Sequence, residues 1–263
     1  MNDKPIGVMD SGIGGLSIWK ELVKELPDES TVYFADNKNC PYGPKSLEEI
    51  HQLAENVVKF LISQNVKLIL VACNTITVSV IDRLRKKFNI PFVGVEPATK
   101  VAVENTRTGK IGILATKGTF RGNLFNETKE KFGGNTNIHL QIGDGLVEMV
   151  ETNSVNTKDS QKLVQNYIDF FLQNNVDQVA LGCTHYPFLK ESLIKLSENK
   201  INFIDPAEAV VKQLRRILEN ENLLSDSNDI KHQIFSSGEI TDLKNLIPQI
   251  DSYSVQLVKN YNH

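Results

Sequence analysis

The pattern of apolar and polar positions divides the chain into short strands that alternate with amphipathic helices. Leu68–Ala72 and Val179–Leu181 predict buried strands, because each apolar run is short and ends at polar residues. Apolar residues recur at helical spacing through Ser46–Ser63 and Ala207–Asn220, which predicts helices with one buried face. Such alternation is typical of an α/β fold with mostly parallel sheets.

The same patterns predict the remaining elements. Further strands are expected at Ile6–Met9, Thr31–Ala35, Phe92–Val95, Ile138–Ile142, Asn202–Ile204, His232–Phe235 and Ser252–Leu257. Further helices are expected at Leu16–Leu26, Ile76–Phe88, Phe120–Phe132, Asp144–Glu151, Asp159–Leu172, Phe188–Leu196 and Ile240–Leu246. The polar segment Leu224–Lys231 predicts a surface loop.

Two motifs occur twice, in the same order. PIGVMDSGIG at 5–14 matches KIGILATKGT at 110–119, and two apolar strands end on Cys73 and on Cys183. The offsets are 105 and 110 residues, which indicates an internal repeat. We therefore predict two similar α/β domains related by a pseudo-twofold axis, with the active site in the cleft between them. The first domain is expected to span 1–96 plus 207–263, and the second 97–206, with the tail returning to the first.

The paired cysteines are the main candidates for chemistry. Asn74 and Thr75 follow the first as expected helix caps, so the helix macrodipole should favour a thiolate at Cys73. Thr184 and His185 follow the second. Ligands of parallel sheets bind at the carboxyl ends of strands, where both thiols are expected. Inversion of a carbon centre by proton exchange needs one base on each face, and two facing thiols would supply them. A single buried cysteine is usually inert, and it is the duplicated context that favours a catalytic pair here.

Two loops lie beside these strand ends. Asp10–Gly15 reads DSGIGG, but a dinucleotide motif would need glycine where Ser17 stands, and no GxxxxGK[ST] occurs. We expect its amides, beside Asp10 and Ser11, to bind a carboxylate. The loop Asn37–Pro44 offers Tyr42 as an aromatic lid and Gly43 as a backbone donor, although a purely structural turn would look the same. Cys40 lies in this loop, and no partner for it is expected.

Composition narrows the classes further. The chain has 263 residues, a formal net charge of -3 and a pI near 6.0, which gives no indication of nucleic acid or of an anionic membrane as a partner. No apolar run approaches the length of a membrane span. The three cysteines form no CxxC pair and no zinc-type spacing, which favours reduced thiols in a cytoplasm and no metal. No lysine has a context that suggests pyridoxal phosphate, so no cofactor is expected.

Five motifs together resemble one known family. They are IGVMDSGIGGL, PYG, ACNT, ILAT and LGCTHYP, which occur in family order across about 200 residues. The chain resembles the cofactor-independent glutamate racemases of the aspartate/glutamate racemase family. The combination of GCTHYP with DSGIGG points to glutamate within that family. The resemblance implies D-glutamate for peptidoglycan as the product, a bacterial cytoplasm and a homodimer.

The resemblance also implies roles for particular residues. Cys73 and Cys183 would be the acid/base pair, the first acting on the D and the second on the L enantiomer. Asp10 would assist Cys73 and His185 would assist Cys183, while Glu151 stands where the family has an acidic residue near the second cysteine. The residues implied in substrate binding are Asp10, Ser11, Tyr42, Gly43, Asn74, Thr75, Thr184 and His185. No arginine is among them, so we expect binding mainly by neutral donors.

Other interpretations remain open at this stage. Asp10 could instead only close the turn after its strand, and Asn74 and Thr75 could only cap a helix. His185 could be a capping or surface histidine. At the level of function, the alternatives are a racemase of the same fold that acts on aspartate or a hydantoin, and a two-lobed protein that only binds an amino acid.

Overall fold

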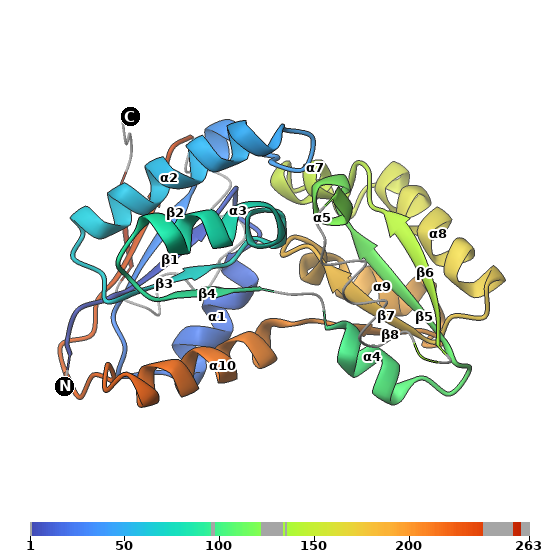
Figure 1. Ribbon diagram of the computed structural model, residues 1–263. Helices are drawn as coiled ribbons and strands as arrows, with labels where there is room; N and C mark the ends of the chain where they lie inside the picture. Colours follow the sequence, from blue (N-terminus) through green and yellow to red (C-terminus); the bar gives the residue numbers. More distant parts are fainter. Residues whose placement is uncertain (1, 96–97, 122–133, 135, 239–254, 259–263) are drawn as a thin grey trace.

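The computed structural model describes residues 2–95, 98–121, 134, 136–238 and 255–258. In this part of the chain the strands form two parallel sheets, each flanked by helices (Figure 1). The first sheet has the order β10-β9-β2-β1-β3-β4, with β1 (Ile6–Asp10), β2 (Thr31–Ala35), β3 (Leu68–Val71), β4 (Phe92–Gly94), β9 (His232–Ser236) and β10 (Val255–Val258). The second has the order β6-β5-β7-β8, with β5 (Lys110–Ala115), β6 (Asn137–Ile142), β7 (Gln178–Gly182) and β8 (Asn202–Ile204). The predicted α/β fold with parallel sheets is confirmed.

The two sheets share a core topology. The order β2-β1-β3-β4 in one corresponds to β6-β5-β7-β8 in the other. Ile6 pairs with Leu68 across β1 and β3, and Ile111 pairs with Gln178 across β5 and β7. Ile111 lies 105 positions after Ile6, and Gln178 lies 110 positions after Leu68. The strand pairing therefore reproduces both offsets that the sequence repeat predicts.

Helices cover both faces of the first sheet. On one face lie α1 (Leu16–Glu25) and α10 (Ala207–Asn220), and on the other lie α2 (Leu47–Ser63) and α3 (Asn74–Lys87). Side chains alternate along β1, so Val8 packs in the same core as Trp19 of α1, whereas Met9 packs in the core that contains Val58 of α2. A capping box between Ser46 and Glu49 begins α2.

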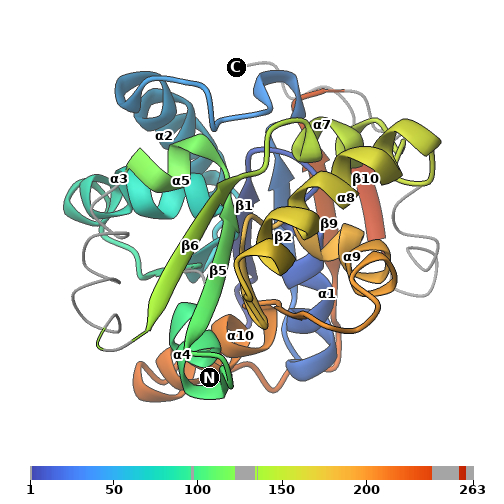
Figure 2. The ribbon, with the colours of Figure 1, turned by 90° about the vertical axis from the view of Figure 1, so that its right-hand side faces the viewer.

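The second sheet carries the remaining helices (Figure 2). They are α4 (Thr99–Asn105), α5 (Lys117–Arg121), α7 (Leu146–Glu151), α8 (Lys158–Gln173) and α9 (Lys190–Leu196), preceded by the short 3₁₀ helix η2 (Tyr186–Leu189); a second 3₁₀ helix, η1 (Asn37–Asn39), follows β2. None of the helices in the described ranges is long and apolar enough to cross a membrane.

Several elements differ from the predicted bounds. Helix α3 begins at Asn74 rather than Ile76, so Cys73 itself takes the N-cap position. Helix α5 begins at Lys117, three residues before the expected start at Phe120, and residues 122–132 of that predicted helix lie outside the described residues. Helix α4 was not predicted. The helix expected at 240–246 and the first residues of the last strand, 252–254, also lie outside the described residues.

The strand order bears on the domain division. β9 follows α10 along the chain and pairs with β2 of the first sheet. Arg215 of α10 donates a hydrogen bond to the carbonyl of Glu25 at the end of α1. These contacts support a division into 1–96 plus 207–263 and 97–206, which stays a prediction.

Candidate active site

The carboxyl ends of four strands meet at one cleft. Asp10 ends β1, Cys73 follows β3 by two residues, Thr116 follows β5, and Cys183 follows β7. These positions come from both sheets, so each half of the repeat contributes one cysteine. The residues that line the cleft are Ser11, Pro41, Tyr42, Gly43, Cys73, Asn74, Thr75, Thr116, Val147, Cys183, Thr184 and His185.

The cleft is narrow in this conformation. Its free volume is about 10 Å³, roughly the space of one water molecule. A neighbouring cavity of about 290 Å³ shares Pro41, Gly43, Thr116 and Val147 with it. The two walls must therefore separate before an amino acid can lie between the thiols.

Cys73 is buried at the beginning of α3. Its thiol donates to the hydroxyl of Ser11 at 3.7 Å. Burial raises the pKa of the Cys73 thiol well above its usual range, and the charge of Asp10 raises it further. The amide of Ile76 and the Ser11 hydroxyl act in the opposite direction but do not compensate. The expectation that the helix N-terminus favours a thiolate here is wrong for this closed cleft, because desolvation is the larger effect.

Asp10 is the ionisable group whose charge acts most strongly on Cys73. One carboxylate oxygen, Oδ2, accepts from the amides of Gly12 and Gly15 at 3.1 Å each, and the other accepts from Thr184 at 3.4 Å. Burial raises the pKa of Asp10 to about 6, partly offset by the positive charge of His185 and these amides. A carboxylate with a pKa near neutrality is suited to exchange protons at physiological pH.

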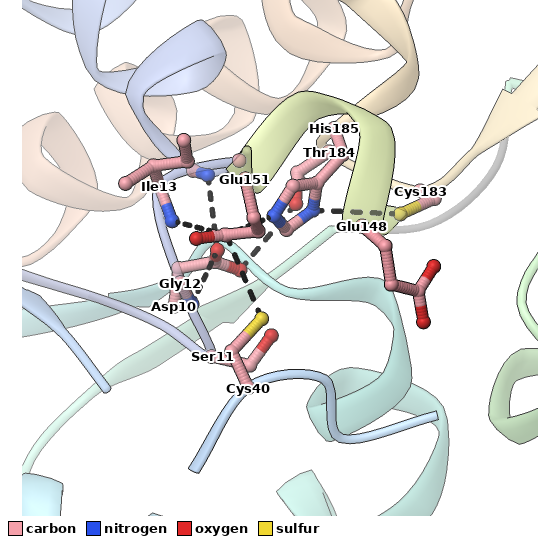
Figure 3. Close-up of polar contacts among 12 residues, drawn as sticks. Asp10, Ser11, Gly12, Ile13, Cys40, Glu148, Glu151, Cys183, Thr184 and His185 are labelled. Carbon is pink, nitrogen blue, oxygen red and sulfur yellow. Dashed lines mark hydrogen bonds and ion pairs between the residues drawn. The ribbon is translucent and has the colours of Figure 1, made fainter. Parts of the chain in front are cut away.

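Cys183 is the first member of a chain of polar contacts (Figure 3). Its sulfur lies 3.7 Å from Nδ1 of His185, and Nε2 of the same ring lies 2.6 Å from Oε1 of Glu151. Burial alone lowers the pKa of His185, but hydrogen bonds with Cys183, Cys40 and Glu151 raise it well above its usual range. Burial raises the pKa of Glu151, but its hydrogen bond and charge interaction with His185 reverse this, and the net change is downward.

Three amides of the glycine loop are not free to bind a ligand. The amides of Gly12 and Gly15 donate to Asp10, and the amide of Ile13 donates to Glu151 at 2.9 Å. The loop does bind carboxylates, as expected from its shape, but they belong to the protein's own side chains. These three amides are therefore already used, and the expectation that the loop binds a substrate carboxylate stays a prediction that depends on Ser11, which lines the cleft.

Asn74 offers an acceptor rather than the donor that we expected. Its Nδ2 donates to the carbonyl of Val95 at 3.5 Å, whereas its buried Oδ1 has no hydrogen-bond partner. Thr75 lies opposite Thr116, with their hydroxyls 2.9 Å apart. This contact joins the two halves at the cleft. An unpaired buried carbonyl oxygen is the natural acceptor for an ammonium group.

Tyr42 lines the cleft with its ring but directs its hydroxyl away from a ligand. The hydroxyl donates to Oδ2 of Asp36 at 2.5 Å, and Ser237 donates to the other oxygen at 2.5 Å. Asp36 is fully buried. The Asp36 carboxylate thus holds two segments in place: the loop that carries Gly43, through Tyr42, and the segment after β9, through Ser237.

Three of the residues around the cleft were missed or under-rated from sequence. Glu151 contacts His185, and Cys40, for which no partner was expected, donates to Glu151 at 3.5 Å. Asp36 was not among the residues predicted for the site. A signal for it existed in its position at the end of β2, beside the NKNCPYG loop.

Comparison with known proteins agrees with this site. The family model described as Asp/Glu/Hydantoin racemase matches residues 6–214. A glutamate racemase of Clostridium botulinum (strain Alaska E43 / Type E3) is 42% identical over 224 residues, which is 85% of this chain and 87% of that protein. A glutamate racemase isoform from Bacillus anthracis superposes with a TM-score of 0.87 at 31% identity and covers 98% of both chains. The glutamate racemase of Francisella tularensis subsp. tularensis SCHU S4, in complex with D-glutamate, gives a TM-score of 0.85 at 30% identity and covers 100% of this chain and 98% of that one.

The fold and these matches define the protein as an amino-acid racemase, which is an isomerase. The chain belongs to the Asp/Glu/Hydantoin racemase family.

Proposed function

We propose that this protein interconverts L- and D-glutamate by proton transfer at the α-carbon, with Cys73 and Cys183 as the two bases. The observation that carries the proposal is the pairing of the two thiols. Each follows an equivalent strand of the repeat, both line one cleft, and each has its own ionisable neighbour, Asp10 for one and His185 for the other. A protein that only binds an amino acid needs neither thiol nor proton acceptor.

The proton balance of the reaction follows from this arrangement. In the L-to-D direction, Cys183 as thiolate takes the α-proton of L-glutamate, and the thiol of Cys73 gives its proton to the opposite face. Cys73 is then the thiolate and Cys183 the thiol, so the charge of the pair is unchanged. The thiols return to the starting state when one proton leaves Cys183 to solvent through His185 and one proton reaches Cys73 from solvent through Asp10. The reverse direction runs through the same groups in the opposite order.

The substrate would be held mainly by neutral groups. The unpaired Oδ1 of Asn74 would accept from the substrate ammonium. The hydroxyls of Ser11 and Thr184 and the amides of Gly43 and Thr75 would donate to the carboxylates. The lining of the cleft in the described residues includes no arginine, while Arg121 lies on the adjacent cavity and donates to the carbonyl of Lys45 at 3.4 Å. Neutral hydroxyls and amides can bind the carboxylates without the cost of removing water from an arginine side chain.

The wider context of the reaction is part of the same proposal. We infer D-glutamate for peptidoglycan as the product, a cytoplasmic location and a homodimer, on the strength of the resemblance to glutamate racemases. Sedimentation of the purified chain tests the dimer directly.

Side-by-side assays test the substrate. With no added cofactor, the circular dichroism signal of L-glutamate should disappear as it racemises. This rate should be far above the rate at which the signal of L-aspartate disappears. Cys73→Ala and Cys183→Ala should each abolish racemisation, because each direction needs both thiols. Faster racemisation of aspartate, or binding of glutamate without any exchange of its α-proton, would contradict the proposal.

A further inference from the structure

His185 faces two different sets of groups with its two nitrogens. Nδ1 faces Cys183, whereas Nε2 faces Glu151, whose Oε1 also accepts from the thiol of Cys40. The potential ligand atoms of Cys40, Glu151 and His185 all lie within 4.8 Å of one another. Among the residues that the structure describes, this is the one such group of three, and Figure 3 shows it on the side of the ring away from Cys183.

We propose that Cys40, Glu151 and His185 form a binding site for a divalent cation of the zinc class, and that the occupied site holds the racemase inactive. The donor set is a thiolate sulfur, an imidazole nitrogen and a carboxylate oxygen, which are the three ligand types that zinc uses in proteins. Three protein ligands leave a fourth tetrahedral position for water.

The spacing of the ligand atoms fits this assignment. Bonds of about 2.3 Å to sulfur and 2.0 Å to oxygen at a tetrahedral angle place the two ligand atoms about 3.5 Å apart. The observed distance from Sγ of Cys40 to Oε1 of Glu151 is 3.5 Å. The distance from Nε2 of His185 to the same oxygen is 2.6 Å and must open to about 3.3 Å when the cation enters between the two atoms.

Metal binding and racemisation use the same ring. One cation enters while the thiol proton of Cys40 and the Nε2 proton of His185 leave, so the net charge of the cluster is unchanged. The neutral ring then carries its single proton on Nδ1, facing Cys183, while the cation holds Nε2. The ring can no longer pass between its cationic and neutral forms, so it stops exchanging protons with Cys183, although the cation lies outside the space between the two thiols.

The test measures binding separately from activity. Zinc binding to the metal-free full-length protein is measured by calorimetry, and Co²⁺ is used as a spectroscopic probe of thiolate ligation. We expect one zinc per chain, and a thiolate-to-cobalt charge-transfer band. Cys40→Ala should weaken zinc binding by at least about tenfold and remove that band. Cys73→Ala serves as the matched control, because it removes a buried thiol of the same cleft without touching the cluster, and it should bind zinc as the unaltered protein does.

Racemisation gives the second readout. The unaltered protein and Cys40→Ala are each assayed against their own metal-free rate, with free zinc set by a chelator buffer, while Cys73→Ala serves only in the binding measurement. The zinc concentration for half inhibition should rise at least about tenfold in Cys40→Ala, and Cys40→Ser provides a second variant if the first folds poorly. The proposal is overturned if the unaltered protein shows no thiolate–cobalt band, if Cys40→Ala keeps full zinc affinity, or if zinc affinity is lost in Cys73→Ala instead. Because binding is read without racemisation, these outcomes do not depend on the two-thiol mechanism.

Discussion

Asp10→Asn should make the protein more stable and far less active. The free energy at stake follows from burial of the carboxylate, which raises its pKa from 3.8 to about 6. This rise in the pKa corresponds to about 3 kcal/mol by which ionised Asp10 destabilises the folded state. Asparagine keeps an oxygen for the amides of Gly12 and Gly15, and its Nδ2 can donate to Thr184, so the variant loses the charge but not the contacts.

The stability gained in Asp10→Asn should increase as the pH rises. Below pH 3.8 the carboxyl is protonated in both folded and unfolded chains and carries no penalty. As the pH rises from there to about 6, the unfolded chain ionises first and the folded state loses relative stability. The advantage of Asp10→Asn should therefore be about 3 kcal/mol at pH 7 and about half of that at pH 5.

Urea unfolding at the two pH values measures this difference. Asp28→Asn, at an exposed position in the turn after α1, is the matched control and should change stability by less than about 0.5 kcal/mol. Racemisation by Asp10→Asn should fall by about 10²–10⁴-fold. It should fall equally in both directions, because the equilibrium constant between enantiomers is fixed. A variant that is no more stable than the unaltered protein at pH 7, or whose advantage grows as the pH falls, would refute the reasoning.

Three further predictions follow from the site. Glu151→Gln should lower the pKa of His185, so the alkaline limb of the pH–rate profile should move to lower pH. In Cys73→Ala, elimination from an L-glutamate analogue with a β-leaving group should survive while the D-analogue is inert, and Cys183→Ala should show the reverse; chromatography of the products distinguishes the two. Asp36→Asn should raise KM by about tenfold or more with a smaller change in kcat, because the loop that binds substrate loses charged hydrogen bonds; initial rates at varied glutamate separate the two constants.

The repeat and the strand-end cysteines could be predicted from sequence because both depend on local patterns. Apolar runs define β3 and β7. Residues such as Ile6 and Ile111 recur at a fixed offset along the chain, and the strand pairing of each sheet has the same offset. Parallel strands then bring Cys73 and Cys183 to the same end of each sheet. This part of the site needed no knowledge of side-chain packing.

The contacts that tune the thiols could not be predicted in the same way. Glu151 lies 138 positions from Ile13 and 111 from Cys40 along the chain, and their contacts depend on how the two halves pack. The pKa of the Cys73 thiol depends on two opposing effects, burial and the helix N-terminus. Only the structure shows how completely the thiol is buried. Asp36 contacts Ser237 across 201 positions, which no local pattern indicates.

The isotopic fate of the α-proton tests the two-thiol mechanism most directly. L-glutamate is incubated with the protein in D₂O, and both enantiomers are separated and analysed at early times. Because Cys183 would remove protium and Cys73 would deliver deuterium, the D-glutamate formed should carry deuterium while the remaining L-glutamate keeps protium. D-glutamate that retains protium, or L-glutamate that gains deuterium as fast as the product forms, would show a single base and contradict the account.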